Sequence, residues 1–144
     1  MFTHVGNDIA EIGPFLDAVE GSARRRCVCA LLERSPWSAF AELWEGVRGE
    51  PPVPLPGLPE FVALLMARGV IPEVAIVGER PFRFDSAEEA EQAARRRLWV
   101  NEGTPMAEQI AELLPSLLRP LADGSVAAGD SRAVGLVSWQ PPGS

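Results

Sequence analysis

The sequence predicts an α/β fold, and three observations support this class. Short apolar runs of strand length alternate along the chain with segments whose apolar residues recur at helical spacing. This alternation is typical of a mainly parallel sheet with helices on its faces. The chain has 144 residues, 47% of them hydrophobic, which suits one globular domain. We therefore expect a single α/β domain over residues 1–140 and a disordered tail at 141–144.

The first strand is short and a helix follows it. Residues 2–5 (FTHV) form a short strand-like run, and Asn7 and Asp8 break it as such residues do at turns. From Ile9 the apolar residues recur at helical spacing. Pro14 fits the first turn of that helix, where a missing backbone N–H costs little. A helix is expected to end near Gly21.

The second strand and helix have the clearest pattern. Residues 27–32 (CVCALL) form a continuous apolar run, typical of a strand that is covered on both faces. Ser35 and Pro36 then resemble an N-cap and a first helical residue, and Gly49 stands where a C-cap glycine belongs. The residues that share the apolar face of this expected helix are Trp37, Phe40, Ala41, Trp44 and Val47.

The remaining elements follow a proline-rich segment at 50–57 (EPPVPLPG), which excludes a helix or a central strand. We expect a stiff connector there, with a proline-rich ligand for another domain as the alternative.

Six further elements are expected after this connector. They are a helix from Pro59 to Gly69, a buried strand at 74–77 continuing as an edge to Phe84, a helix over about 86–99, a helix from Pro105 that bends or ends at Pro115, a loop at 122–132 and a last strand at 133–139. Ser86 and Glu89 form a capping-box pattern. The arginines at 95–97 suit the helix C-terminus, a phosphate site being the alternative.

Composition excludes several classes of function. A net charge of −7 is unsuited to nucleic-acid backbones, so no nucleic-acid partner is expected. His4, Cys27 and Cys29 make neither a zinc site nor a disulfide framework. We therefore expect no metal and a reduced, cytoplasmic chain, with buried cysteines or a redox pair as the alternatives. No apolar run reaches the ~18 residues of a membrane span, so no membrane partner is expected.

Several segments together carry a resemblance to a known family. They are HVGNDIAEIGPF (4–15), ARRRCVCALLE (23–33), SPWSAFAELW (35–44), residues 61–69, PEVAIVGERPFRF (72–84), residues 86–98 and AVGLVSWQ (133–140). In order and spacing they resemble the second half of a bacterial class I S-adenosylmethionine-dependent methyltransferase. The resemblance implies an incomplete Rossmann-like three-layer sandwich, made of strands four to seven of that family's sheet, with an antiparallel last strand.

The resemblance also implies a function. In the family the cofactor, S-adenosyl-L-methionine, lies on a glycine-rich turn and an acidic residue in the first half of the sheet. This sequence has no GxGxG cluster, so we expect the cofactor half outside the chain and poor cofactor binding by the chain alone. The alternatives are a non-catalytic methyltransferase-like remnant acting as an interaction module, and an acidic α/β adaptor unrelated to methyl transfer. The open side of the first strand predicts a homodimer or a partner subunit.

The candidate site residues lie where the first two strands end, because ligands bind at that edge in open α/β sheets. In the resembled family the loop at this position borders the methyl-acceptor pocket, so Asn7 and Asp8 could orient a small-molecule methyl acceptor and His4 could act as a base. The alternative is that Asn7 and Asp8 cap a helix and His4 is a packed strand residue. Trp37 and Phe40 could line a pocket for an apolar acceptor, as the resemblance implies, or pack in the core. The sequence assigns no catalytic residue.

Overall fold

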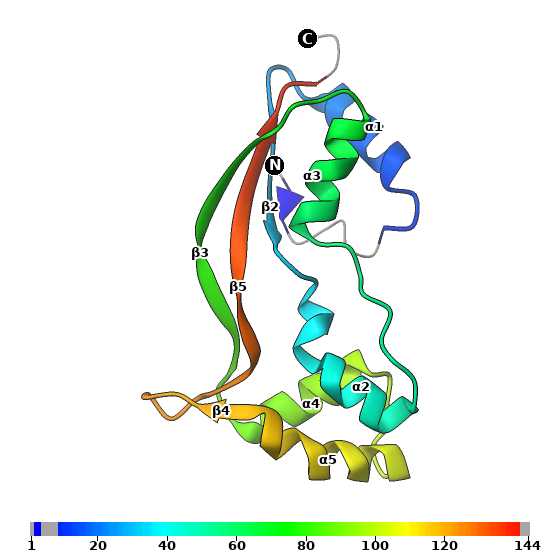
Figure 1. The fold of residues 1–144 in the computed structure, drawn as a ribbon, viewed down its shortest axis with the longest axis vertical. Helices are drawn as coiled ribbons and strands as arrows, with labels where there is room; N and C mark the ends of the chain where they lie inside the picture. Colours follow the sequence, from blue (N-terminus) through cyan, green and yellow to red (C-terminus); the bar gives the residue numbers. More distant parts are fainter. Residues whose placement is uncertain (1, 4–8, 142–144) are drawn as a thin grey trace. The chain divides into compact units, whose positions relative to one another are not determined.

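The structure is a computed structural model that describes residues 2–3 and 9–141, with side chains for all of these except residues 2, 3, 36, 37 and 80 (Figure 1). Strands and helices mix along the chain, which confirms the α/β class. The elements are β1 (Phe2–Thr3), α1 (Ile12–Ser22), β2 (Cys27–Leu32), the 3-10 helix η1 (Pro36–Phe40), α2 (Ala41–Arg48), α3 (Leu58–Ala67), β3 (Glu73–Phe84), α4 (Ala87–Arg97), α5 (Pro105–Leu117), β4 (Leu118–Pro120) and β5 (Val126–Trp139).

The strands form one mixed sheet in the order β1-β2-β5-β3, with β4 paired to β5. β1 is parallel to β2, and β5 is antiparallel to β2 from Cys27↔Trp139 to Leu32↔Val134. β3 lies beside β5 and runs the opposite way (Figure 1). β1, β2 and β3 therefore share one direction, and β5 is inserted against it. The expected antiparallel last strand is confirmed.

The chain divides into two compact units, which we describe one at a time. The sheet unit comprises Met1–Ser35, Leu55–Arg80 and Arg132–Ser144, and the helical unit comprises residues 36–54 and 81–131. β3 and β5 each begin in one unit and end in the other. The expectation of a single domain over residues 1–140 stays a prediction.

In the sheet unit, α1 and α3 cover one face of β2 and β5 (Figure 1). Because side chains alternate along a strand, one face of β2 carries Cys27, Cys29 and Leu31, and all three are buried. The core on this face comprises Leu16, Cys27, Cys29, Leu31, Leu58, Phe61, Leu65, Val70, Val137 and Trp139. The opposite face is more open, because Val28 and Ala30 are half-buried and Leu136 is 39% exposed.

The helical unit has its own core, built from α2, α4, α5, η1 and the nearby strand ends. Small residues on α4 allow close packing, and its buried members are Ala90, Ala93 and Ala94. Ser86 caps this helix by accepting a hydrogen bond from the Glu89 N–H at 3.2 Å, as the capping pattern predicts. The Glu89 carboxylate accepts from the Asp85 N–H at 2.7 Å, one residue before the position that a standard capping box uses.

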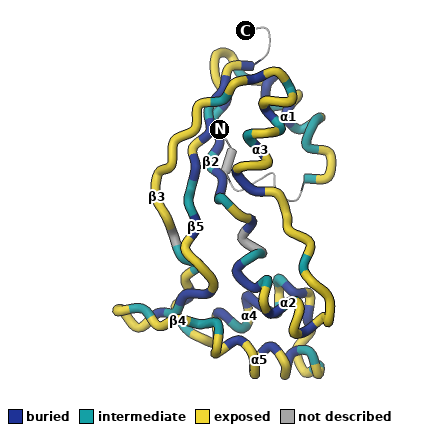
Figure 2. Tube along the Cα trace, viewed as in Figure 1, coloured by how far each residue is buried: buried dark blue, intermediate teal, exposed yellow. Residues whose placement is uncertain are grey.

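The expected burial of residues 74–77 is wrong, although the strand itself is present. Val74, Ile76 and Val77 are 45%, 59% and 55% exposed, and the tube is exposed along this stretch of β3 (Figure 2). These residues are exposed because β3 is the last strand in the sheet order and pairs on one side only. An apolar run predicts a strand but not its place in the sheet.

The expected loop at 122–132 is also wrong, because β5 begins at Val126 and pairs with β4 from Leu118↔Ala128 to Pro120↔Val126. The hairpin turns through Asp123-Gly124, where Gly124 has a φ of 87°. Small and polar residues are depleted in strands, so composition alone predicted a loop. Asp-Gly is a hairpin signal, and it marks this turn.

The single helix expected after Ser35 is instead divided into η1 and α2.

Candidate functional site

The site residues predicted from the sequence are only partly described. His4, Asn7 and Asp8 lie outside the described residues, as does the side chain of Trp37. Phe40 is fully buried in the core of the helical unit. Its ring centroid lies 5.9 Å from that of Phe84. This burial favours the core alternative for Phe40 over a role in lining an acceptor pocket.

Trp44, expected to be buried on the same helix face, is half-buried. Its ring meets the ring of Trp99 edge-on, with centroids 6.3 Å apart. The guanidinium carbon of Arg48 lies 5.5 Å from the Trp44 ring centroid, within the range of a cation–π contact. The helix face shared by Phe40 and Trp44 is therefore apolar, as expected, but it extends to the surface of the helical unit at Trp44.

A small pocket lies at the carboxyl end of β2, and we call it the edge pocket. It has a volume of about 150 Å³ and lies where the first turns of α1 and α3 meet β2. Its lining residues are Ile9, Ile12, Leu31, Pro56, Gly57, Glu60, Phe61 and Leu64. Ile9 directly follows the segment that holds His4, Asn7 and Asp8. The pocket therefore lies at the sheet edge where the sequence predicts a ligand site.

Beside the edge pocket, the start of α3 approaches the end of β2 very closely. A Cβ atom added at Gly57 would lie 2.0 Å from the carbonyl oxygen of Glu33 and 3.1 Å from the Cα of Arg34. At Gly135 of β5, an added Cβ would lie 2.5 Å from a methyl carbon of Leu58. Only glycine permits the contact at Gly57, since any Cβ atom there would clash with backbone atoms of Glu33 and Arg34. These two glycines allow the first turn of α3 to lie against the sheet.

The walls of the edge pocket are apolar and come from separate elements. Leu31 and Phe61 belong to the buried core, whereas Ile9, Ile12 and Leu64 are half-buried. The charged group is the exposed carboxylate of Glu60, whose Oε2 accepts a hydrogen bond from the Gly57 N–H at 2.8 Å. In a full capping box, a side-chain oxygen of the N-cap residue accepts a second hydrogen bond. Gly57 has no side-chain oxygen, so only the bond to Glu60 forms. Chemically, the pocket offers an apolar cavity with a carboxylate among its lining residues.

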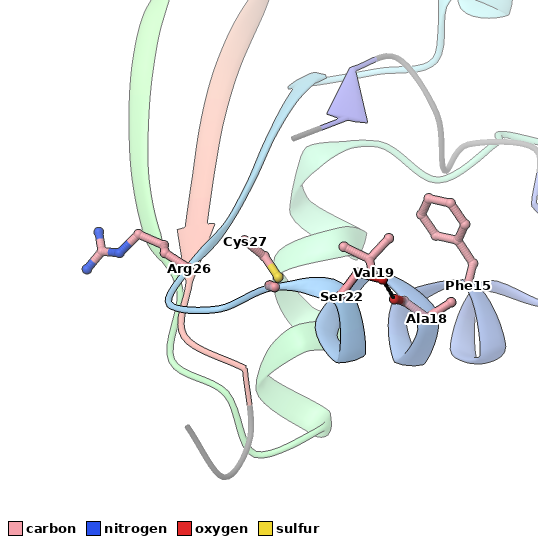
Figure 3. A pocket seen from close by; sticks show the side chains of 7 residues that line it. Phe15, Ala18, Val19, Ser22, Arg26 and Cys27 are labelled. Carbon is pink, nitrogen blue, oxygen red and sulfur yellow. Dashed lines mark hydrogen bonds between the residues drawn. The ribbon is translucent and has the colours of Figure 1, made fainter.

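A second pocket lies at the amino end of β2 (Figure 3). It is larger, at about 430 Å³, and more open, and its lining residues are Phe15, Ala18, Val19, Ser22, Ala23, Arg26 and Cys27. The Arg26 side chain points away from the other lining residues (Figure 3), toward an ion pair with Glu73 at 2.6 Å. Ligands of open α/β sheets bind at the carboxyl ends of strands, so the edge pocket is the better candidate.

The two cysteines of β2 are poor nucleophiles. Both are free and buried. Burial raises the pKa of the Cys29 thiol to about 12 and also raises the pKa of Cys27. The thiolate is the reactive form, and a raised pKa makes it scarce at neutral pH. The structure therefore favours structural burial over the redox-pair alternative.

A partly buried charged network joins the elements around the sheet core, and the sequence analysis did not single it out. Glu20 of α1 is buried and accepts a hydrogen bond from the Trp139 Nε1–H at 2.9 Å. Arg68 donates to Glu20 at 2.8 Å and to Asp17 at 2.6 Å. The network ties α1, the end of α3 and β5 together. Its signal in the sequence is Glu20 itself, four residues after the buried Leu16 on the apolar side of α1.

The described residues do not fit the S-adenosylmethionine site that the resemblance implies. Glu33 follows β2 at the carboxyl edge, but its Oε2 accepts a hydrogen bond from the Ala133 N–H at 3.4 Å. Among the described residues, no glycine-rich turn follows β2 at that edge. Across residues 2–3 and 9–141, no group of three or more His, Cys, Asp or Glu side chains could hold a metal ion. Within the same ranges, every helix is too short or too polar to cross a membrane.

Comparison of the chain with protein-family models, with curated proteins and with solved structures gives no match. The sheet and the edge pocket are therefore the features that bear on function.

Proposed function

We propose that this chain is the C-terminal, acceptor-side half of a class I S-adenosylmethionine-dependent methyltransferase. The observation that carries the proposal is the position of β5, antiparallel between β2 and β3. The resemblance implies an antiparallel final strand added to a parallel sheet, and the order β1-β2-β5-β3 supports this arrangement. In this proposal, β1, β2, β5 and β3 correspond to strands four, five, seven and six of the expected sheet.

The more open face of the sheet unit gives further support. In doubly wound α/β folds, helices cover both faces of the sheet. Here α1 and α3 cover one face, and Leu136 on the other face is 39% exposed. A cofactor half that paired with β1 would bring helices of its own to this face. The proposal therefore accounts for the open face as the surface against which the cofactor half packs, completing the Rossmann-like three-layer sandwich.

Within this proposal, the edge pocket receives the methyl acceptor. His4, Asn7 and Asp8 precede the pocket-lining Ile9 in the chain, and they are the residues we expect to orient the acceptor. The cofactor half supplies the glycine-rich turn and the acidic residue that hold S-adenosylmethionine. This chain contributes the acceptor wall and the strands that extend the sheet.

The test begins with the DNA upstream of the start codon. An in-frame stretch that encodes a strand and a glycine-rich turn is expected, and the extended chain should bind S-adenosylmethionine in calorimetric titration. The 144-residue chain alone is the matched control and should not bind it. Micromolar binding to the isolated monomeric chain, or a stop codon with a separate ribosome-binding site directly upstream, would count against the proposal.

A second candidate function is an interaction module that pairs with a second copy of the chain. The observation that favours it is the exposed apolar part of β3, where Ile76 is 59% exposed and Ile71, just before the strand, is 90% exposed. An uncovered apolar edge strand is a template for association. In light scattering, the chain should be dimeric and Ile76→Lys should be monomeric. The control Met66→Lys, at an exposed position on α3, should stay dimeric, and a monomeric wild type would exclude this function.

A further inference from the structure

We infer that the edge pocket binds one monocyclic aromatic group that is neutral or positively charged. The pocket has a volume of about 150 Å³. An apolar cavity of about 150 Å³ lined by Leu, Ile and Phe side chains stays dry and accepts a benzene ring. Leu31, Phe61 and Leu64 line the edge pocket together with two isoleucines, and the exposed residues Pro56 and Glu60 also line it, so it opens to solvent. Its size and its walls thus point to a single ring.

Backbone contact sets how closely α3 lies against β2 beside the pocket. Gly57 lies against the backbone of Glu33 and Arg34 so closely that α3 cannot approach β2 further. Leu31 and Phe61 belong to the close-packed core of the sheet unit, and such cores deform little. The cavity is therefore preformed, which is typical of sites for small ligands.

Glu60 sets the charge that the ligand can carry. Its carboxylate lines the pocket and accepts one hydrogen bond, from the Gly57 N–H. An ionised carboxylate can accept about four hydrogen bonds, so it retains capacity for an N–H or O–H group on the ring. The same charge repels a carboxylate on the ligand. An aromatic amine or phenol suits the site, and an aromatic acid does not.

Binding of the ring requires neither a cofactor nor a second chain. The further statement that this ring is the methyl acceptor, or part of it, rests on the proposed function. The two statements can therefore fail separately. Loss of S-adenosylmethionine binding by the extended chain would leave the ring site intact, whereas absence of ring binding would leave the methyltransferase proposal in place with a different acceptor.

The experiment is a titration of the isotopically labelled chain with benzylamine, phenol and benzoate, followed by heteronuclear NMR. We expect saturable shifts at Leu31, Phe61 and Leu64 with benzylamine and phenol, and binding weaker by about tenfold or more with benzoate. Leu64→Phe fills the pocket and should weaken benzylamine binding by about tenfold. Met66→Phe adds the same bulk on an exposed part of α3 and should bind as the wild type does.

Two further variants make the result specific. Ile12→Phe fills the pocket from α1, so it replaces Leu64→Phe if that variant does not give a folded spectrum. Glu60→Gln keeps the size of the side chain and removes its charge, so it should bring the affinities for benzylamine and benzoate together. Non-saturable shifts with all three compounds, unchanged binding in a folded filling variant, or an unchanged charge preference in Glu60→Gln would each overturn the inference.

Discussion

Replacing Gly57 by alanine tests the close approach of α3 to β2 beside the edge pocket. The new Cβ would lie 2.0 Å from the carbonyl oxygen of Glu33, 2.8 Å from its carbonyl carbon and 3.1 Å from the Cα of Arg34. All three atoms are backbone, so no side-chain rotation relieves the clash. Overpacking typically costs about 1–3 kcal/mol. We expect the upper end of that range, because the helix α3 must move as a whole.

That loss is large against the whole stability of a domain, which is about 5–15 kcal/mol. Urea unfolding followed by circular dichroism should show a lower midpoint with an unchanged slope, which marks a change in stability rather than in the extent of unfolding. The benzylamine shifts at Leu31 and Phe61 should weaken in the same variant, since the pocket wall moves.

Gly21→Ala is the matched control for Gly57→Ala. Gly21 lies in α1, and an added Cβ there meets nothing within 4 Å. Alanine is favoured over glycine in a helix by about 0.5–1 kcal/mol, so this variant should be slightly more stable than the wild type. Opposite signs for the two substitutions are the expected result. A Gly57→Ala variant as stable as the wild type would refute the close approach of α3 to β2.

Three other predictions concern the thiols, a surface ion pair and a strained residue. Cys27 and Cys29 have raised pKa values, so both should react slowly with a disulfide reagent in the folded chain and rapidly in urea; rapid reaction of the folded chain would contradict their burial. Arg26 lowers the pKa of Glu73, so their ion pair stabilises the fold at pH values above the ordinary pKa of a glutamate carboxyl. This stabilisation is lost as the pH falls through the lowered pKa of Glu73. Arg26→Ala should raise the Glu73 titration midpoint in NMR, and an unchanged midpoint would exclude the pair. Trp99 has a φ of 52°, in the left-handed region that favours glycine, and its side chain is 71% exposed. Trp99→Gly should therefore stabilise the chain by up to about 1 kcal/mol in urea unfolding. Destabilisation would show that the contacts of the Trp99 side chain outweigh the backbone strain.

Local signals predicted most helices and strands well. Proline at a first turn and glycine after a last turn are sufficient to place α3, which begins at Leu58 and is followed by Gly69 with a φ of 81°. The failures lie where pairing between distant segments decides the structure. Residues 126–132 have a loop-like composition, yet the strand begins at Val126 because β4 pairs with residues 126–128.

The candidate site was predictable in position but not in detail. The rule that ligands bind at the carboxyl ends of parallel strands placed the site after β1 and β2, and the edge pocket lies there. The wall formed by Phe61 and Leu64 was not predicted, because it depends on contact between α3 and a strand far earlier in the chain. Gly57 stands at the end of a proline-rich segment, where a glycine is ordinary, and its contact with Glu33 has no local signal.

The two proposed functions use opposite ends of the sheet, which makes them separable. A cofactor half would pair with β1, whereas the exposed apolar residues lie on β3 at the other end of the strand order. A missing half at β1 therefore does not explain the exposure of Val74, Ile76 and Val77. That exposure is an independent observation, and it favours association through β3 whether or not the chain is part of an enzyme. If both proposals hold, Ile76→Lys should abolish dimerisation and leave S-adenosylmethionine binding by the extended chain unchanged. Loss of both properties together would instead mean that the cofactor half reaches β3, and the strand assignment that supports the methyltransferase proposal would be wrong.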